Sequence, residues 1–155
     1  DKTAALFAAC AESGARAAGA SAEDIERLKT FGEIVGICFQ IRDDIFDYQD
    51  DATIGNPTGT DMKEGKLTLP VIHVLFKEAS DEMFGIAYKV KDGTVAPEEV
   101  ERLVKFTKDN GGIDYAYEVM ERYAAEAKAL LEKYLDSSVK TSLFHYIDYV
   151  IGRKL

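Results

Sequence analysis

The sequence has no tryptophan and only two cysteines and three prolines among its 155 residues. The two cysteines, Cys10 and Cys38, form no CxxC or CxxH pair. This spacing argues against a disulfide framework and against a cysteine-based zinc site. We therefore expect both to be reduced, buried thiols of a cytoplasmic protein.

Basic side chains are scarce relative to acidic ones, with 19 Lys and Arg against 28 Asp and Glu and a formal net charge of −9. Binding to nucleic acid needs clustered Lys and Arg to neutralise phosphates, so no nucleic-acid partner is expected. No apolar run approaches the roughly 20 residues that a membrane-crossing helix needs, so no stable membrane insertion is expected either. The 46% hydrophobic content instead predicts a packed domain, which we assign as one unit over residues 1–155.

The chain begins with Asp1 rather than Met, and residues 2–18 already have the apolar spacing of a helix. A helix with no cap or loop before it favours a fragment of a longer protein. A processed natural terminus is the alternative.

Helical spacing of apolar residues recurs along the chain, and no segment alternates in the manner of a strand. The fold predicted is therefore an all-α helical bundle. Its helices are expected at residues 2–18, 22–48, 67–77 and 81–89, from Pro97 onward, from Ile113 to Tyr134 and after Asp136. Gly32 and Gly36 lie one turn apart in the second of these, where each costs about 1 kcal/mol against alanine. A helix or a ligand packed closely against them would compensate, and a helix crossing is the simpler explanation.

The segment FQIRDDIFDY, residues 39–48, has the strongest chemical character. Asp43 and Asp47 are four residues apart, so on a helix their carboxylates lie one turn apart on the same face. Two like charges near a helix C-terminus are unfavourable unless a cation lies between them. Mg²⁺ fits, because it takes one or two carboxylates together with waters and substrate phosphates, and Asp44 would be a second or outer ligand. An acidic cluster in an acidic protein is also often only a solvated face.

The loop that follows strengthens the metal hypothesis. Residues 55–70 combine glycines, which let the backbone approach a ligand, with Lys63 and Lys66, which reach phosphates. Magnesium on one side and lysine on the other would form a clamp for a diphosphate.

FQIRDDIFDY followed by GNPTGTDMKEGKLTLP resembles the second aspartate-rich motif and the following loop of trans-type polyprenyl diphosphate synthases. The resemblance extends over essentially the whole chain, including a Lys-Thr pair near its start. It implies the C-terminal part of the isoprenoid synthase fold. It also implies a prenyltransferase that condenses an allylic diphosphate with isopentenyl diphosphate to make a longer all-trans polyprenyl diphosphate.

The resemblance implies a role for each residue that matches the family's motifs. The implied metal ligands are Asp43, directly, and Asp44 and Asp47, directly or through water. The implied contacts to the allylic diphosphate and the polar floor of its cavity are Lys2, Thr3, Gln40 and Lys66. Stabilisation of the departing diphosphate makes Asp43, Asp44 and Lys66 the expected catalytic residues.

Two features depart from the family's pattern. The family has another DDxxD on an earlier helix, whereas here Asp50 and Asp51 are followed by Ala-Thr-Ile. Asn56 stands near a place where family members commonly have lysine. We therefore expect a C-terminal fragment that is inactive alone and that belongs to a homodimer when full-length. The alternative is a non-catalytic or regulatory subunit of a heteromeric synthase, which the intact DDxxD and Lys66 disfavour.

Other candidate residues are expected to be structural. His73 and His145 are predicted to be satisfied core or interface histidines, and His73 has no second ligand four residues further on. Arg153 and Lys154 fit either a basic tail over a diphosphate or a solvated basic end of a helix.

Overall fold

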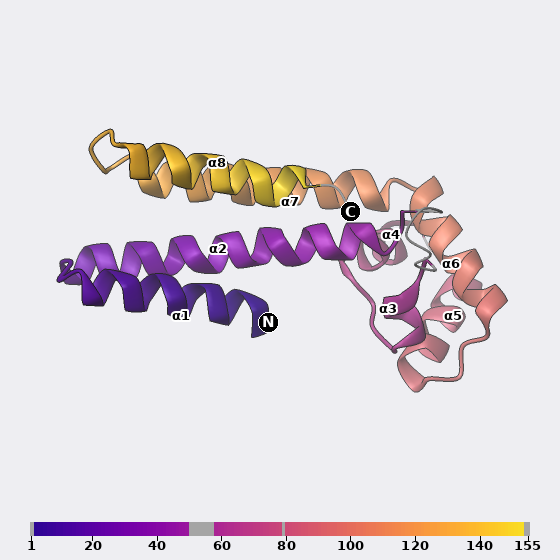
Figure 1. The fold of residues 1–155 in the computed structure, drawn as a ribbon. Coiled ribbons are helices and arrows are strands. Elements are labelled where there is room, and N and C mark those ends of the chain that lie inside the picture. The colour runs from indigo at the N-terminus through magenta and orange to yellow at the C-terminus, as the bar shows by residue number, and fades with distance from the viewer. Residues whose placement is uncertain (1, 50–57, 79, 154–155) are drawn as a thin grey trace. The chain divides into compact units, whose positions relative to one another are not determined.

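The computed structural model describes residues 2–49, 58–78 and 80–153, with the backbone alone at Glu78. Within these ranges the chain forms eight helices and no strand, which confirms the all-α prediction (Figure 1). The helices are α1 Lys2–Ala17, α2 Ala22–Phe46, α3 Thr60–Lys63, α4 Leu69–Glu78, α5 Asp81–Asp92, α6 Pro97–Asp109, α7 Gly112–Leu131 and α8 Ser138–Gly152. Every predicted helix is present, and α3 is the one that was not predicted. None of the helices in the described ranges has the length and apolar content to cross a bilayer.

The helix ends follow the local signals in the sequence. The Ser21 hydroxyl oxygen accepts the N–H of Asp24 at 3.1 Å and so caps the start of α2. Ser137 caps α8 in the same way by accepting the N–H of Lys140 at 3.1 Å. At the other end of a helix, α5 ends at Asp92, and Gly93, with a φ of 72°, is its C-cap.

Contacts divide the chain into two compact units, one of residues 1–42 and 119–155 and one of residues 43–118. In the first unit α1 runs back along α2, and α8 runs back along α7 (Figure 1). A Cβ on Gly36 would lie 2.6 Å from the Cα of Ala4, and one on Gly32 would lie 2.5 Å from the carbonyl oxygen of Phe7. Only glycine allows this approach, so the helix-crossing interpretation of both glycines is confirmed.

The end of α8 is held against α2 within the first unit. Arg42 is 6% exposed, and its Nε and Nη2 donate to the carbonyl oxygen of Arg153 at 3.0 and 2.6 Å. The Arg153 guanidinium lies 3.9 Å from the ring centroid of Phe39. Arg153 is therefore a packed residue and not a solvated basic end, while Lys154 lies outside the described residues.

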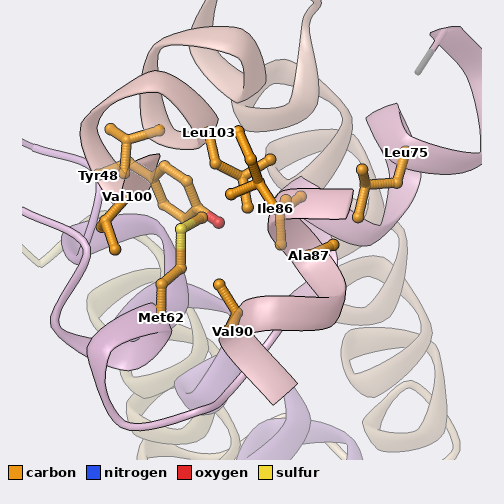
Figure 2. Packing of buried hydrophobic residues seen from close by; sticks show 10 residues of the cluster. Tyr48, Met62, Leu75, Ile86, Ala87, Val90, Val100 and Leu103 are labelled. Atoms are coloured by element: carbon orange, nitrogen blue, oxygen red, sulfur yellow. The ribbon is translucent and has the colours of Figure 1, made fainter. Parts of the chain in front are cut away.

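The core of the second unit is built where α6 packs against α3, α4 and α5. Figure 2 shows Met62 of α3 pointing toward Tyr48, which follows the end of α2. Both side chains are almost fully buried. The core residues around them are Val71, Leu75, Ile86, Ala87, Val90, Val100, Leu103 and Val104. This core fixes the short helix α3 next to the end of α2.

Two of the residue-level expectations need correction. Cys38 is buried as expected, and burial raises the pKa of its thiol to about 11, but Cys10 is exposed. Cys10 lies on a face of α1 that the apolar spacing does not bury.

His73 stacks on Tyr115 with 3.6 Å between ring centroids, as expected of a packed histidine. His145, by contrast, is exposed on α8 and is not a core histidine, since Ile147 and Val150 provide the buried face there.

Candidate functional site

The paired aspartates lie on the last turn of α2, in the second unit. Asp43 and Asp44 are both half-buried, and that turn, residues 43–46, has no basic side chain. Asp47 follows the helix end directly, and its N–H donates to the carbonyl oxygen of Asp43 at 3.3 Å. Carboxylates at this end of a helix meet the negative pole of its dipole, so the placement is unfavourable without a cation.

Asp47 bonds to the next segment of the chain. Its Oδ1 accepts the backbone N–H of Thr60 at 2.9 Å and its Oδ2 accepts that of Asp61 at 3.2 Å. Its carbonyl oxygen accepts the N–H of Gly59 at 3.0 Å. Burial raises the pKa of Asp47, and the two backbone N–H donors to its carboxylate oppose that rise. The side chain therefore caps the start of α3.

Gly59 gives the turn its shape. Its φ of 75° lies in the left-handed region, and a Cβ there would lie 2.5 Å from Cγ1 of Val100. A residue with a side chain would be strained in its backbone and would also collide with α6. The glycine of the Gly-Thr-Asp sequence is thus needed for α3 to pack where it does.

Lys66 follows the end of α3 and is bonded back to Asp61 in that helix. Its backbone N–H donates to the carbonyl oxygen of Asp61 at 2.8 Å. Its ammonium lies 2.7 Å from Oε2 of Glu64 and 3.5 Å from Oδ1 of Asp61, while the side chain stays 59% exposed. The hydrogen bond to Glu64 and the negative charge of Glu64 raise the pKa of the Lys66 ammonium. Lys66 is therefore a charged, accessible ammonium, linked through Asp61 to the turn that Asp47 caps.

The remaining predicted contacts lie in the first unit. Thr3 on α1 donates its hydroxyl to Oε1 of Gln40 on α2 at 3.3 Å, so two residues 37 positions apart are brought together. Lys2 precedes Thr3 at the start of α1 and is exposed. The resemblance implies that these three residues and Lys66 serve one cavity, and the structure joins Thr3 with Gln40. Asp50, Asp51 and Asn56, which bear on the departures from the motif, lie outside the described residues.

The donor set fits a hard divalent cation. Over residues 2–49, 58–78 and 80–153, no three His, Cys, Asp or Glu side chains are gathered as a ready-made metal cage. Mg²⁺, however, commonly takes only one or two protein carboxylates and completes its shell with waters and phosphates. Asp43 and Asp44 are carboxylates of this kind, and both are half-buried on a helix turn that has no basic side chain.

Sequence reasoning missed the capping role of Asp47. The signal for it was the Gly-Thr-Asp sequence, in which a glycine precedes a helix start and an acidic residue falls in the first turn. The acceptor, however, comes from 13 residues earlier in the chain, so local spacing does not reveal it.

The model of the polyprenyl synthetase family matches residues 1–107 of the chain. The chain belongs to the polyprenyl synthetase family. A geranylgeranyl diphosphate synthase from Methanosarcina mazei is 36% identical over 154 residues, which cover 99% of this chain and 46% of that protein. The chain thus spans about half the length of the polyprenyl synthetases it matches.

Solved structures of polyprenyl synthetases have the same fold. A geranylgeranyl pyrophosphate synthase from Bacteroides thetaiotaomicron superposes with a TM-score of 0.93 at 50% identity, over 97% of this chain and 50% of that one. A polyprenyl synthase from Caulobacter crescentus, complexed with calcium and isoprenyl diphosphate, superposes with a TM-score of 0.86 at 29% identity. That match covers 99% of this chain and 47% of the other. The fold is therefore the isoprenoid synthase fold over about half its length.

Proposed function

We propose that this chain is part of a Mg²⁺-dependent polyprenyl diphosphate synthase and holds the allylic diphosphate. The enzyme condenses that substrate with isopentenyl diphosphate to make a longer all-trans polyprenyl diphosphate. The observation that carries the proposal is the linkage of Asp47 to Lys66 through the turn at Asp61. It ties the aspartate-rich helix end to the lysine-bearing loop inside one unit. Family membership and the metal and isoprenyl diphosphate in the Caulobacter relative support it.

In this proposal Asp43 ligates the metal directly and Asp44 supports it directly or through water. Mg²⁺, when bound, neutralises negative charge on the departing diphosphate. The Lys66 ammonium donates hydrogen bonds to the diphosphate oxygens. To do so it exchanges Glu64, which is an exposed partner, for the substrate. Exposed ion pairs contribute only about 0–1 kcal/mol, so this exchange costs little.

The polar residues of the first unit complete the proposed substrate contacts. Lys2 adds a second ammonium for the allylic diphosphate. Thr3 and Gln40, which are hydrogen-bonded to each other, are proposed to give the substrate further polar contacts. No covalent nucleophile is needed, because the bond to the diphosphate breaks as the allylic cation forms and positive groups stabilise the leaving charge.

The chain alone is proposed to have little or no turnover. It carries one DDxxD, and the family uses two that face each other. A homodimer of the full-length enzyme and a cytoplasmic location stay predictions. Robust product formation by the isolated chain would contradict the assignment of half the metal cage to sequence outside it.

The test of the proposed function is Asp43→Ala in the synthase that contains this chain. We expect kcat to fall by about 100-fold or more, since charge stabilisation in the transition state is lost, with an unchanged melting temperature. Asp109→Ala is the matched control, because Asp109 is an exposed aspartate paired with Lys105 on α6. The control should change neither quantity. A melting temperature that falls together with kcat in Asp43→Ala would assign Asp43 a structural role and overturn the proposal.

A further inference from the structure

We propose that Asp47 is a positioning residue and not a metal ligand. In this proposal it sets the place of Lys66 by capping the turn between them. The inference rests on the proposed function for what Lys66 does, while the capping itself is independent of it. It divides the three aspartates of the motif into two proposed metal ligands, Asp43 and Asp44, and a third that holds the loop.

The carboxylate of Asp47 is already engaged on both oxygens. One oxygen accepts the N–H of Thr60 and the other accepts that of Asp61, at 2.9 and 3.2 Å. These two N–H groups stand at the start of α3, where no helical carbonyl precedes them. Turning the carboxylate toward a metal would remove the acceptor that both N–H groups share at the start of α3. The Asp47 carboxylate therefore stabilises the start of α3 where it lies, and it would not do so as a metal ligand.

The Asp47 cap is connected to Lys66 through a single residue, Asp61. Asp61 receives the cap on its N–H, and its carbonyl oxygen and carboxylate then accept from the backbone N–H and the ammonium of Lys66. Met62, the next residue in the chain, is buried in the core of the second unit. Loss of the Asp47 cap would free the first residues of α3. The Lys66 ammonium, which binds the diphosphate in the proposed function, would then lose its fixed position.

The first test needs neither metal nor substrate. Amide hydrogen exchange is measured on the isolated chain and on Asp47→Ala and Asp43→Ala. We expect the amides of Thr60 and Asp61 to exchange about tenfold faster in Asp47→Ala, because their acceptor is gone. Asp43→Ala should leave them unchanged. Equal exchange of these amides in wild type and Asp47→Ala would overturn the proposal.

Asp47→Asn keeps the test decisive if the alanine variant does not fold. Asparagine has one acceptor oxygen in place of two. It should therefore protect one of the Thr60 and Asp61 amides and release the other. Protection of both amides in Asp47→Asn, or release of both, would contradict the arrangement.

The second test separates positioning from metal binding in the synthase that contains the chain. Asp47→Ala should raise KM for the allylic diphosphate about tenfold, with partial rescue in Asp47→Asn, because asparagine is also a good cap. The Mg²⁺ concentration that gives half-maximal rate should stay unchanged in Asp47→Asn and rise in Asp43→Asn. A rise of equal size in both variants would make Asp47 a ligand and refute the proposal. If Asp43→Asn leaves the Mg²⁺ dependence unchanged, the proposed function fails while the exchange result still decides the role of Asp47.

Discussion

The carboxylate of Asp47 accepts the backbone N–H of Thr60, with 2.9 Å between Oδ1 and the amide nitrogen. This bond joins the end of α2 to the start of α3 across 13 positions of sequence. It places the aspartate-rich helix end and the lysine-bearing turn in one unit of the fold. A diphosphate site of the kind proposed here depends on that connection.

Gly59→Ala tests whether the turn depends on glycine. The matched control is Gly93→Ala, since Gly93 has a similar φ of 72° but open space where the Cβ would lie. The control should lose about 1–2 kcal/mol of unfolding free energy from backbone strain alone. Gly59→Ala should lose a further 1–3 kcal/mol or so from the collision with Val100. Urea unfolding of both variants gives the comparison, and equal losses would show that the turn can shift away from α6.

The crossing of α1 and α2 predicts opposite effects for two similar substitutions. Gly36→Ala would place a Cβ 2.6 Å from the Cα of Ala4, which is backbone and cannot rotate away. We expect it to destabilise the protein by about 1–3 kcal/mol. Gly14→Ala, inside α1 with nothing within 4 Å, should stabilise it by about 0.5–1 kcal/mol. Thermal unfolding distinguishes them, and a stable Gly36→Ala would mean that the helices do not approach as described.

Much of this architecture follows from local patterns. The stripe of α7 has Met120, Ala124, Ala127 and Leu131 buried, as the spacing by threes and fours predicts. The short α3 does not follow from such a pattern. It has four residues, and it persists because Asp47 caps it from a distance and because Met62 is buried. Helix periodicity is local information, whereas a short helix of this kind depends on tertiary contacts.

The candidate site also has one part that the sequence predicts and one part that depends on tertiary contacts. The carboxylate spacing and the lysine in the following loop were predictable, because the residue types needed for a metal and a phosphate are chemically specific. The separate role of Asp47 was not, since aspartate serves both as a metal ligand and as a helix cap. The exposure of Cys10 was not predictable either, because the sequence around it is as rich in alanine as a buried helix face would be.

The exposure of Cys10 and the burial of Cys38 predict different thiol reactivity. Burial raises the pKa of Cys38 to about 11, and its Sγ donates to the carbonyl oxygen of Met120 at 3.6 Å. A thiol-specific reagent should therefore modify Cys10 rapidly and Cys38 only after unfolding. Mass spectrometry of the labelled native chain locates the modification. Rapid native labelling at Cys38 would contradict the packing of α2 described here.

Acid sensitivity should depend on Asp24. Hydrogen bonds from the hydroxyls of Ser21 and Tyr134, together with Arg27, hold the pKa of Asp24 below its ordinary value of 3.8. A carboxylate with a lowered folded pKa stabilises the fold above its unfolded pKa, and that contribution is lost as the pH falls through the folded value. The difference in unfolding free energy between wild type and Asp24→Asn should thus be fully present at neutral pH. It should shrink below about pH 4. A difference that grew on acidification would have the wrong sign for this network.

The most direct test of the central claim is calorimetric titration of the isolated chain with an allylic prenyl diphosphate, with Mg²⁺ and again with a chelator in its place. The account predicts binding that requires Mg²⁺ and weakens by about tenfold or more in both Asp43→Asn and Lys66→Met. Lys105→Met, at an exposed lysine on α6, should bind as the wild type does. Binding that is as strong with the chelator, or that survives unchanged in Asp43→Asn, would contradict the claim that these residues hold a metal-bound diphosphate.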